Sequence, residues 1–220
     1  MVVILERVII FVDGSNFYHS IKNQNVIKID HAAFFNSLIS ENQQLININY
    51  YNAPVNQKQF PKLYVLQQKY FSKLSKIDNL ILKLGRLEER KNPFKEEIQN
   101  SLKYILLLLS NLKINENIDK IKSEILKLND LFNKFLYKGN FVEKGIDVNI
   151  ALDLITLAHE NKYDCAILIS NDSDFVPAIK YLKNLKKKVI GVFFQNSKAH
   201  HLRNNCTEII NINNLDNFKL

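Results

Sequence analysis

The chain has 220 residues, of which 46% are hydrophobic and 24% charged, a composition that indicates a folded globular protein rather than a disordered one. Its formal net charge of +8 favours a polyanionic partner, although the cations are mostly lysines, which AT-rich genomes also encode in abundance. Two cysteines exclude a disulfide framework and a cysteine-based zinc site, and the apolar start is too short for a signal peptide or a membrane span. We therefore expect a soluble, cytoplasmic protein without membrane contact.

Strand and helix patterns alternate in the first part of the chain. The expected strands cover residues 7–12, 45–51 and 80–87. The expected helices cover residues 16–22, 30–40 and 57–76. Asp30 has the position of an N-cap, and the third helix is expected to present Phe60 and Leu66 among its apolar residues. This β-α-β-α-β order predicts a parallel sheet with right-handed crossovers.

The composition changes near residue 90, and apolar residues then recur four and three positions apart, as in the seam of a coiled coil. The expected seam residues are Ile98, Leu102, Ile105, Leu109 and Leu112, then Ile118, Ile121, Ile125, Leu128, Phe132 and Phe135. We interpret residues 91–137 as an antiparallel helical hairpin inserted into one α/β domain, residues 1–90 and 138–220. Leucines 106–108 lie off the seam and are expected to pack on that domain or on a second copy of the chain, so the hairpin is a candidate contact for a homodimer or a protein partner.

The α/β pattern resumes after the hairpin. The expected strands cover residues 165–169, 188–194 and 208–212. The expected helices cover residues 147–161, 174–186 and 197–203. The fold class that follows is α/β, with a mostly parallel central sheet between layers of helices.

Four aspartates stand where a strand or loop gives way to a helix: Asp13, Asp147, Asp172 and Asp174. Asp13 and Asp172 follow uncharged strands that are expected to be neighbours in the sheet, and ligands of open α/β sheets bind outside such strand ends. Carboxylates that share a crevice repel each other unless a cation neutralises them, and hard oxygen ligands suit Mg²⁺ or Mn²⁺. Such an ion can stabilise the charge that develops on a phosphodiester during cleavage.

Each of these aspartates also has a simpler explanation. Asp174 is in place to cap a helix, Asp147 to favour the first turn of one, and Asp13 to form a turn with Gly14. The neighbouring polar residues fit a substrate site better, because the Asn16 amide can orient a water or a phosphate oxygen. Small hydroxyl side chains accompany it at Ser15, Ser170 and Ser173.

Three motifs occur in order: FVDGSNFY at 11–18, KGIDV at 144–148 and SNDSDFVP at 170–177. Together they resemble the NYN domain family in its LabA-like branch, which belongs to the PIN-like nucleases. The resemblance covers the chain outside the hairpin. It implies a Rossmann-like, PIN-like α/β/α sandwich that hydrolyses RNA with clustered aspartates and Mg²⁺ or Mn²⁺.

The resemblance also implies roles for individual residues. The implied catalytic residues are Asp13, Asn16, Asp147, Asp172 and Asp174, and the four aspartates are the implied metal ligands. Asp153 matches a further acid of the family but is expected to face away from Asp147. Asn171 stands where the family usually has glycine, so a turn with positive φ would be strained there, although asparagine tolerates it.

Basic residues supply the expected phosphate contacts. Lys144 lies beside Asp147, and Arg86 follows the third strand at the same edge of the sheet as the acids. Lysines 186–188 are expected at the opposite edge, away from substrate. His200 and His201 follow the strand at 188–194, and we expect surface or RNA contact from them rather than zinc binding, because adjacent helical side chains point about 100° apart.

The leading hypothesis is a metal-dependent ribonuclease. The main alternative is a non-catalytic RNA-binding or regulatory module with the same fold. A phosphatase of the haloacid dehalogenase type would need a second aspartate at the position of Ser15. An interaction protein built around the hairpin at 91–137 is the remaining possibility.

Overall fold

A computed structural model describes residues 5–24, 26, 28–89, 94–110, 121–130, 141–195 and 197–220. The chain forms two compact units. The first combines Met1–Arg86 with Lys144–Leu220, and the second is Leu87–Glu143. Every candidate catalytic or substrate-binding residue belongs to the first unit.

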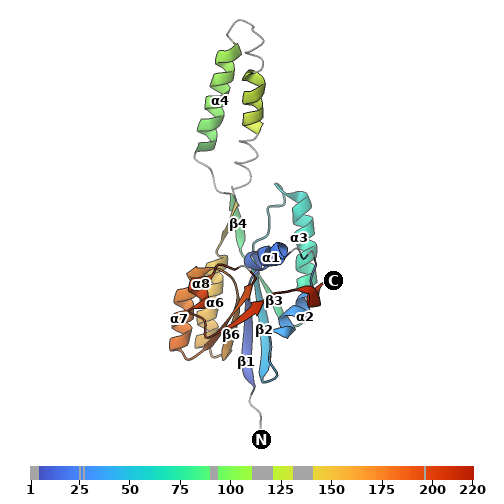
Figure 1. The fold of residues 1–220 in the computed structure, drawn as a ribbon, viewed down its shortest axis with the longest axis vertical. Coiled ribbons are helices and arrows are strands. Elements are labelled where there is room, and N and C mark those ends of the chain that lie inside the picture. The colour runs from blue at the N-terminus through green and yellow to red at the C-terminus, as the bar shows by residue number, and fades with distance from the viewer. Residues whose placement is uncertain are drawn as a thin grey trace. The chain divides into compact units, whose positions relative to one another are not determined.

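A six-stranded sheet forms the centre of the first unit, in the order β3-β2-β1-β6-β7-β8 (Figure 1). The strands are β1 Glu6–Asp13, β2 Gln43–Asn52, β3 Leu80–Leu84, β6 Cys165–Ile169, β7 Lys188–Phe194 and β8 Glu208–Ile212. All five neighbouring pairs are parallel. The predicted α/β fold with a mostly parallel sheet is therefore confirmed.

Helices cover both faces of this sheet, and their packing follows from the alternation along the strands. On one side lie α1 Gly14–Asn23, α2 His31–Ser37 and α3 Pro61–Leu74; on the other lie α6 Ile146–His159, α7 Val176–Asn184 and α8 His200–Arg203 (Figure 1). Val8, Ile10 and Val12 of β1 share one core with Phe17 of α1, while the intervening Phe11 meets the ring of Tyr163. Because both faces are covered, the central strands carry unbroken apolar runs, residues 8–12 in β1 and residues 165–169 in β6.

The strand order reverses between β1 and β6. From β1 the chain continues to β2 and β3 on one side, and from β6 it continues to β7 and β8 on the other. Val12 is paired with Ile169, so Asp13 at the end of β1 and Ser170 directly after β6 lie next to each other. In open parallel sheets this reversal is where ligands bind.

The strands predicted over 165–169, 188–194 and 208–212 have the observed bounds. The helix predicted over 174–186 is instead a short 3₁₀ turn, η1 Ser173–Phe175, followed by α7. The helices predicted over 57–76 and 197–203 are shorter, and Phe60 and Leu66, which were expected on an apolar face, are exposed.

The single strand predicted over 80–87 is wrong. β3 ends at Leu84, and β4 Arg86–Glu89 belongs to a separate two-stranded sheet with β5 Phe141–Lys144, which was not predicted. Gly85 separates them, and a Cβ there would lie 2.6 Å from Cδ1 of Ile146. The chain thus passes tightly against the start of α6 as it leaves the large sheet.

The second unit contains α4 Phe94–Ser110 and a helix over 121–130. Of the expected seam residues, Leu102 is buried, whereas Ile105, Ile121 and Leu128 are exposed. The expected turn at 115–117 lies outside the described residues. Among the described helices, none combines the length and the apolarity that crossing a bilayer requires.

Candidate active site

Asp13 ends β1 and is the N-cap of α1. Its Oδ1 accepts a hydrogen bond from the backbone N of Asn16 at 3.1 Å, and its Oδ2 accepts one from Asn16 Nδ2 at 2.5 Å. Ser170 Oγ also donates to Oδ2, at 3.0 Å. The residue is 2% exposed, and no described lysine, arginine or histidine forms a salt bridge with it. Its oxygens are satisfied by neutral donors, so its negative charge is not compensated within the described residues.

Ser170 connects this carboxylate to the acidic loop after β6. Its Oγ donates to Asp13 and accepts a hydrogen bond from the backbone N of Asp172 at 3.1 Å. The Asp172 carboxylate accepts from the backbone N of Asp174 at 2.8 Å and is the N-cap of η1. One buried serine therefore holds together the ends of β1 and β6, and with them Asp13, Asn16 and Asp172.

These contacts correct two of the simpler explanations given above. Asp174 was the expected cap, but Asp172 caps η1, and α7 starts after Phe175 without a side-chain cap. Asp13 forms a helix cap rather than a turn. Asn171 is not strained, because the non-glycine residues with positive φ in the described structure are Asn79, Asn161 and Lys186.

The other candidates lie in the same unit without completing a closed cluster. Asp147 is exposed in the first turn of α6, which begins after Gly145 with φ of +82° and packs against η1. Asp174 and Ser173 are exposed in η1, Lys144 and Arg86 are exposed on β5 and β4, and Ser15 is partly buried in α1. Among the described residues, no three His, Cys, Asp or Glu side chains are grouped closely enough to form a ready-made metal site.

The donor chemistry nevertheless suits a hard divalent cation. The aspartates at the ends of β1 and β6 and in η1 offer only oxygen atoms, which Mg²⁺ and Mn²⁺ prefer. Among the described residues the buried Asp13 has no cationic partner, so a positive ion beside it would be stabilised.

Asp153 takes no part in this arrangement. It accepts a hydrogen bond from Tyr51 Oη at 2.6 Å and forms an ion pair with Lys83 Nζ at 2.6 Å. Burial raises the pKa of Tyr51 above its ordinary value, and the hydrogen bond to Asp153 raises it further. Lys83 neutralises its charge, and the contacts of Asp153 with Tyr51 on β2 and Lys83 on β3 join α6 to the sheet.

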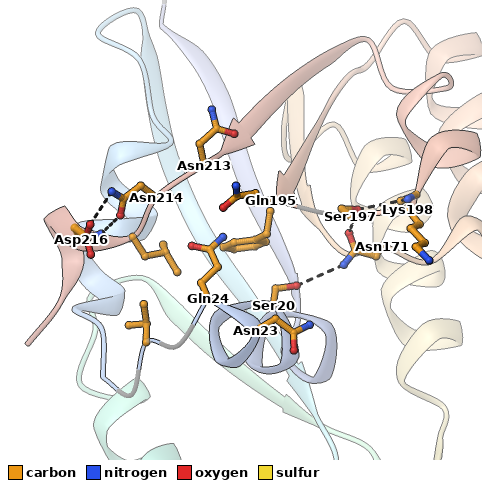
Figure 2. Close-up of a pocket in the computed structure, with 14 residues that line it drawn as sticks. Ser20, Asn23, Gln24, Asn171, Gln195, Ser197, Lys198, Asn213, Asn214 and Asp216 are labelled. Atoms are coloured by element: carbon orange, nitrogen blue, oxygen red, sulfur yellow. Dashed lines mark hydrogen bonds between the residues drawn. The ribbon is translucent and has the colours of Figure 1, made fainter.

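A pocket of about 680 Å³ opens beside Asn171 (Figure 2). Six amide residues line it: Asn23, Gln24, Asn171, Gln195, Asn213 and Asn214. Of these, the sequence drew attention to Asn171 alone, and not as part of a pocket. The available signal was positional, since Asn171, Gln195 and Asn213 each follow within two residues of the end of a parallel strand.

Comparisons with known proteins agree on the fold. The model of the NYN domain matches residues 7–213. A crystal structure of a protein of unknown function from Vibrio parahaemolyticus is similar with a TM-score of 0.60 and 17% identity, and the match covers 100% of this chain and 99% of that one. At this identity the similarity shows a common fold only. No curated protein matches the chain significantly.

Proposed function

The chain belongs to the NYN domain family, whose members are generally nucleases, and we propose that it is a ribonuclease of the LabA-like branch that uses Mg²⁺ or Mn²⁺. The observation that carries the proposal is Asp13 at the point where the strand order reverses, a buried carboxylate whose donors within the described structure are all neutral. Ser170 joins it by hydrogen bonds to the loop after β6, which carries Asp172 and Asp174.

The aspartates are proposed as the ligands of the ion. Asp13, Asp147 and Asp172 would hold it, and Asp174 would bind it directly or through water. The ion would neutralise negative charge on the phosphodiester and on its attacking oxygen. Asn16 has a positioning role, because its backbone N and its Nδ2 both donate to Asp13 and fix the direction of that carboxylate.

Polar and basic residues near the acids are proposed to bind the RNA backbone. Lys144 and Arg86 would contact phosphates, and Ser15, Ser170 and Ser173 leave room for the sugar–phosphate chain. Lys188 begins β7 at the amino edge of the sheet and pairs with Glu208, so it is not part of this surface.

The test compares two aspartates that cap helices in the same way. Asp13 accepts from Asn16 N at 3.1 Å, and Asp30 accepts from Ala33 N at 3.0 Å. Asn caps a helix about as well as Asp, so Asp13→Asn and Asp30→Asn should both retain the thermal unfolding midpoint of the wild type. Cleavage of mixed single-stranded and structured RNA should fall more than about 100-fold in Asp13→Asn alone, since even residues that merely orient metal ligands contribute about 10–100-fold.

Each protein is assayed with Mn²⁺, with Mg²⁺ and with a chelator. Chelator-sensitive cleavage that is lost in Asp13→Asn and kept in Asp30→Asn supports the assignment. Equal cleavage by Asp13→Asn and the wild type contradicts it.

The separation of the acids favours one alternative, a non-catalytic RNA-binding or regulatory module, because no three of the described metal-binding side chains are grouped. Such a module would bind RNA with an affinity that falls with salt and does not depend on Mg²⁺. Binding of this kind, without cleavage in any metal, would replace the nuclease proposal.

A further inference from the structure

The pocket of about 680 Å³ lies at the carboxyl edge of the sheet, beyond β6, β7 and β8 and beside α1 (Figure 2). Six of its described lining residues are asparagine or glutamine, and the charged ones are Lys198 and Asp216. Asp216 forms an ion pair with Lys219. The volume lies in the range of pockets that bind small molecules. The pocket is thus large enough for a ligand and is dominated by carboxamides.

Some of these amides hold the walls of the pocket. Asn171 Oδ1 accepts a hydrogen bond from Ser197 Oγ at 2.6 Å, and Asn214 Nδ2 donates to Asp216 at 2.7 Å. Gln24 Nε2 donates to the backbone O of Ile212 at 3.4 Å. These bonds join the segment after β6 to the segment after β7, and the end of β8 to the end of α1.

Three other amide side chains of the pocket are available for a ligand. The side chains of Asn23, Gln195 and Asn213 make no hydrogen bond to any residue that the structure describes, and all three are exposed. They come from α1, from the residue after β7 and from the segment after β8, and all three line the pocket (Figure 2). Each offers one acceptor and two donor hydrogens to a ligand.

The pocket shares a wall with the candidate active site. Asn171 stands between Ser170 and Asp172, and its Nδ2 donates to Ser20 Oγ at 3.4 Å. Ser20 lies four residues after Asn16 on α1, hence on the same face of that helix. If an RNA chain places a phosphate near Asp13, the nucleotide next to that phosphate therefore lies beside this pocket.

We propose that this pocket binds a nucleobase of the substrate RNA, next to the phosphate that is cut, and reads its hydrogen-bonding edge through the amides of Asn23, Gln195 and Asn213. The proposal rests on the nuclease function proposed above. Asn and Gln pair with N6 and N7 of adenine through both amide atoms, so adenine is the expected base. Bases of single-stranded RNA expose the edges that such side chains read.

The lining favours a base over a phosphate as the ligand. Phosphate sites gather arginines, lysines or successive backbone N–H groups, whereas Lys198 is the one described cation in this lining. Phe194 and Leu215 also line the pocket but are only 4% and 1% exposed, so the surface that a ligand would meet is mainly that of the amides.

The experiment measures binding and cleavage separately in the full chain. Binding of labelled oligoadenylate, oligocytidylate and oligouridylate is measured in the Asp13→Asn variant, so that cleavage does not interfere. Gln195→Ala and Asn213→Ala are added singly. Asn36→Ala is the control, because Asn36 is an exposed amide on α2 whose side chain likewise has no hydrogen bond within the described structure.

We expect oligoadenylate to bind best, and its affinity to fall about tenfold in Gln195→Ala and in Asn213→Ala but to stay unchanged in Asn36→Ala. The wild type should cleave beside adenine faster, and the same two substitutions should remove that preference. Equal affinity for the three oligonucleotides, or a preference that both substitutions leave intact, overturns the proposal.

The two proposals fail separately. Cleavage that is lost in Asp13→Asn but shows no dependence on Gln195 or Asn213 leaves the nuclease in place and removes the base pocket. Base-selective binding that depends on these amides, in a protein that cleaves no RNA, keeps the pocket and removes the nuclease.

Discussion

Two aspartates at opposite ends of neighbouring strands have opposite environments. Asp164, just before β6, accepts bonds from Arg7 Nε at 2.9 Å and Nη2 at 2.8 Å, and Lys187 lies 3.8 Å away. Asp13, at the far end of β1, accepts hydrogen bonds from neutral donors alone among the described residues. The charge of Asp164 is thus paired within the fold, whereas the charge of Asp13 remains available to a ligand.

The first of these environments sets a dependence on pH. Hydrogen bonding to Arg7 lowers the pKa of Asp164 from 3.8 to about 2. Because its folded-state pKa is depressed, its contribution to stability is present above pH 4 and is lost as the pH falls toward 2. Asp164→Asn should therefore unfold at lower urea than the wild type at pH 7, and the two midpoints should converge near pH 2.

The side chain of Asp164 is 41% exposed, so solvent screens the pair and the difference at pH 7 should be small and should shrink in 1 M salt. Asp216→Asn removes a separate exposed ion pair, with Lys219, and shows how much such a pair contributes to the urea midpoint at pH 7. A midpoint difference for Asp164→Asn that stays constant from pH 7 to pH 2 would contradict the assignment.

Among the elements, α1 and α6 both depend on a glycine at their start, but for different reasons. A Cβ on Gly14 would lie 2.4 Å from the backbone O of Tyr51, so α1 can approach β2 only with glycine. Gly145 has open space, with its nearest neighbour at 3.9 Å, but has φ of +82°. One position is restricted by packing and the other by backbone conformation.

The two substitutions to alanine should therefore differ. Gly145→Ala should cost about 1–2 kcal/mol of unfolding free energy, the penalty of a left-handed conformation. Gly14→Ala should cost more, because backbone atoms must move, and it should also weaken cleavage by displacing Asn16 from Asp13. Urea unfolding with a parallel RNA cleavage assay measures both effects. A smaller loss of unfolding free energy in Gly14→Ala than in Gly145→Ala would show that α1 can move away from β2 at little cost.

The ends of an element could be predicted where residues next to it in the sequence mark them, and could not where contacts in the fold set them. β6 is an apolar run between Asp164 and Ser170, so its ends were readable from the sequence. The end of β3 within the strand expected over 80–87 could not be read from the sequence, because it depends on the close approach of Gly85 to Ile146 in the fold. The positions of Asp13 and Asp172 at the ends of β1 and β6 could be predicted, because apolar runs precede them. The pocket amides could not, since Asn23 and Asn213 are ordinary polar residues until the strand order brings them together.

At the scale of the whole molecule, the chain combines a unit built on the six-stranded sheet with the unit Leu87–Glu143. The first unit has its own core, which draws on β1, β2, β6 and β7 and on α1 to α3. We propose that residues 91–137 are an accessory insertion, which a homodimer or a protein partner would use, rather than part of the catalytic machinery.

Replacing residues 91–137 with a short Gly-containing turn tests this directly. The shortened chain should fold and should cleave a short RNA within about twofold of the wild-type rate, because closing a shorter loop changes the folding free energy only slightly. Circular dichroism and the cleavage assay measure the two properties, and light scattering of both proteins shows whether the insertion sets the oligomeric state. Loss of cleavage in a folded variant would assign the insertion a role in substrate binding.

The hydrogen bond between Ser170 and Asp13 joins positions 157 apart in the sequence. During translation, β1, β2 and β3 emerge and can pair long before β6 exists, because synthesis proceeds at about 5–20 residues per second. The proposed site is incomplete until the strand ending at Ile169 has been inserted beside β1. A nascent chain that has not yet extended to Ile169 would therefore lack the proposed site.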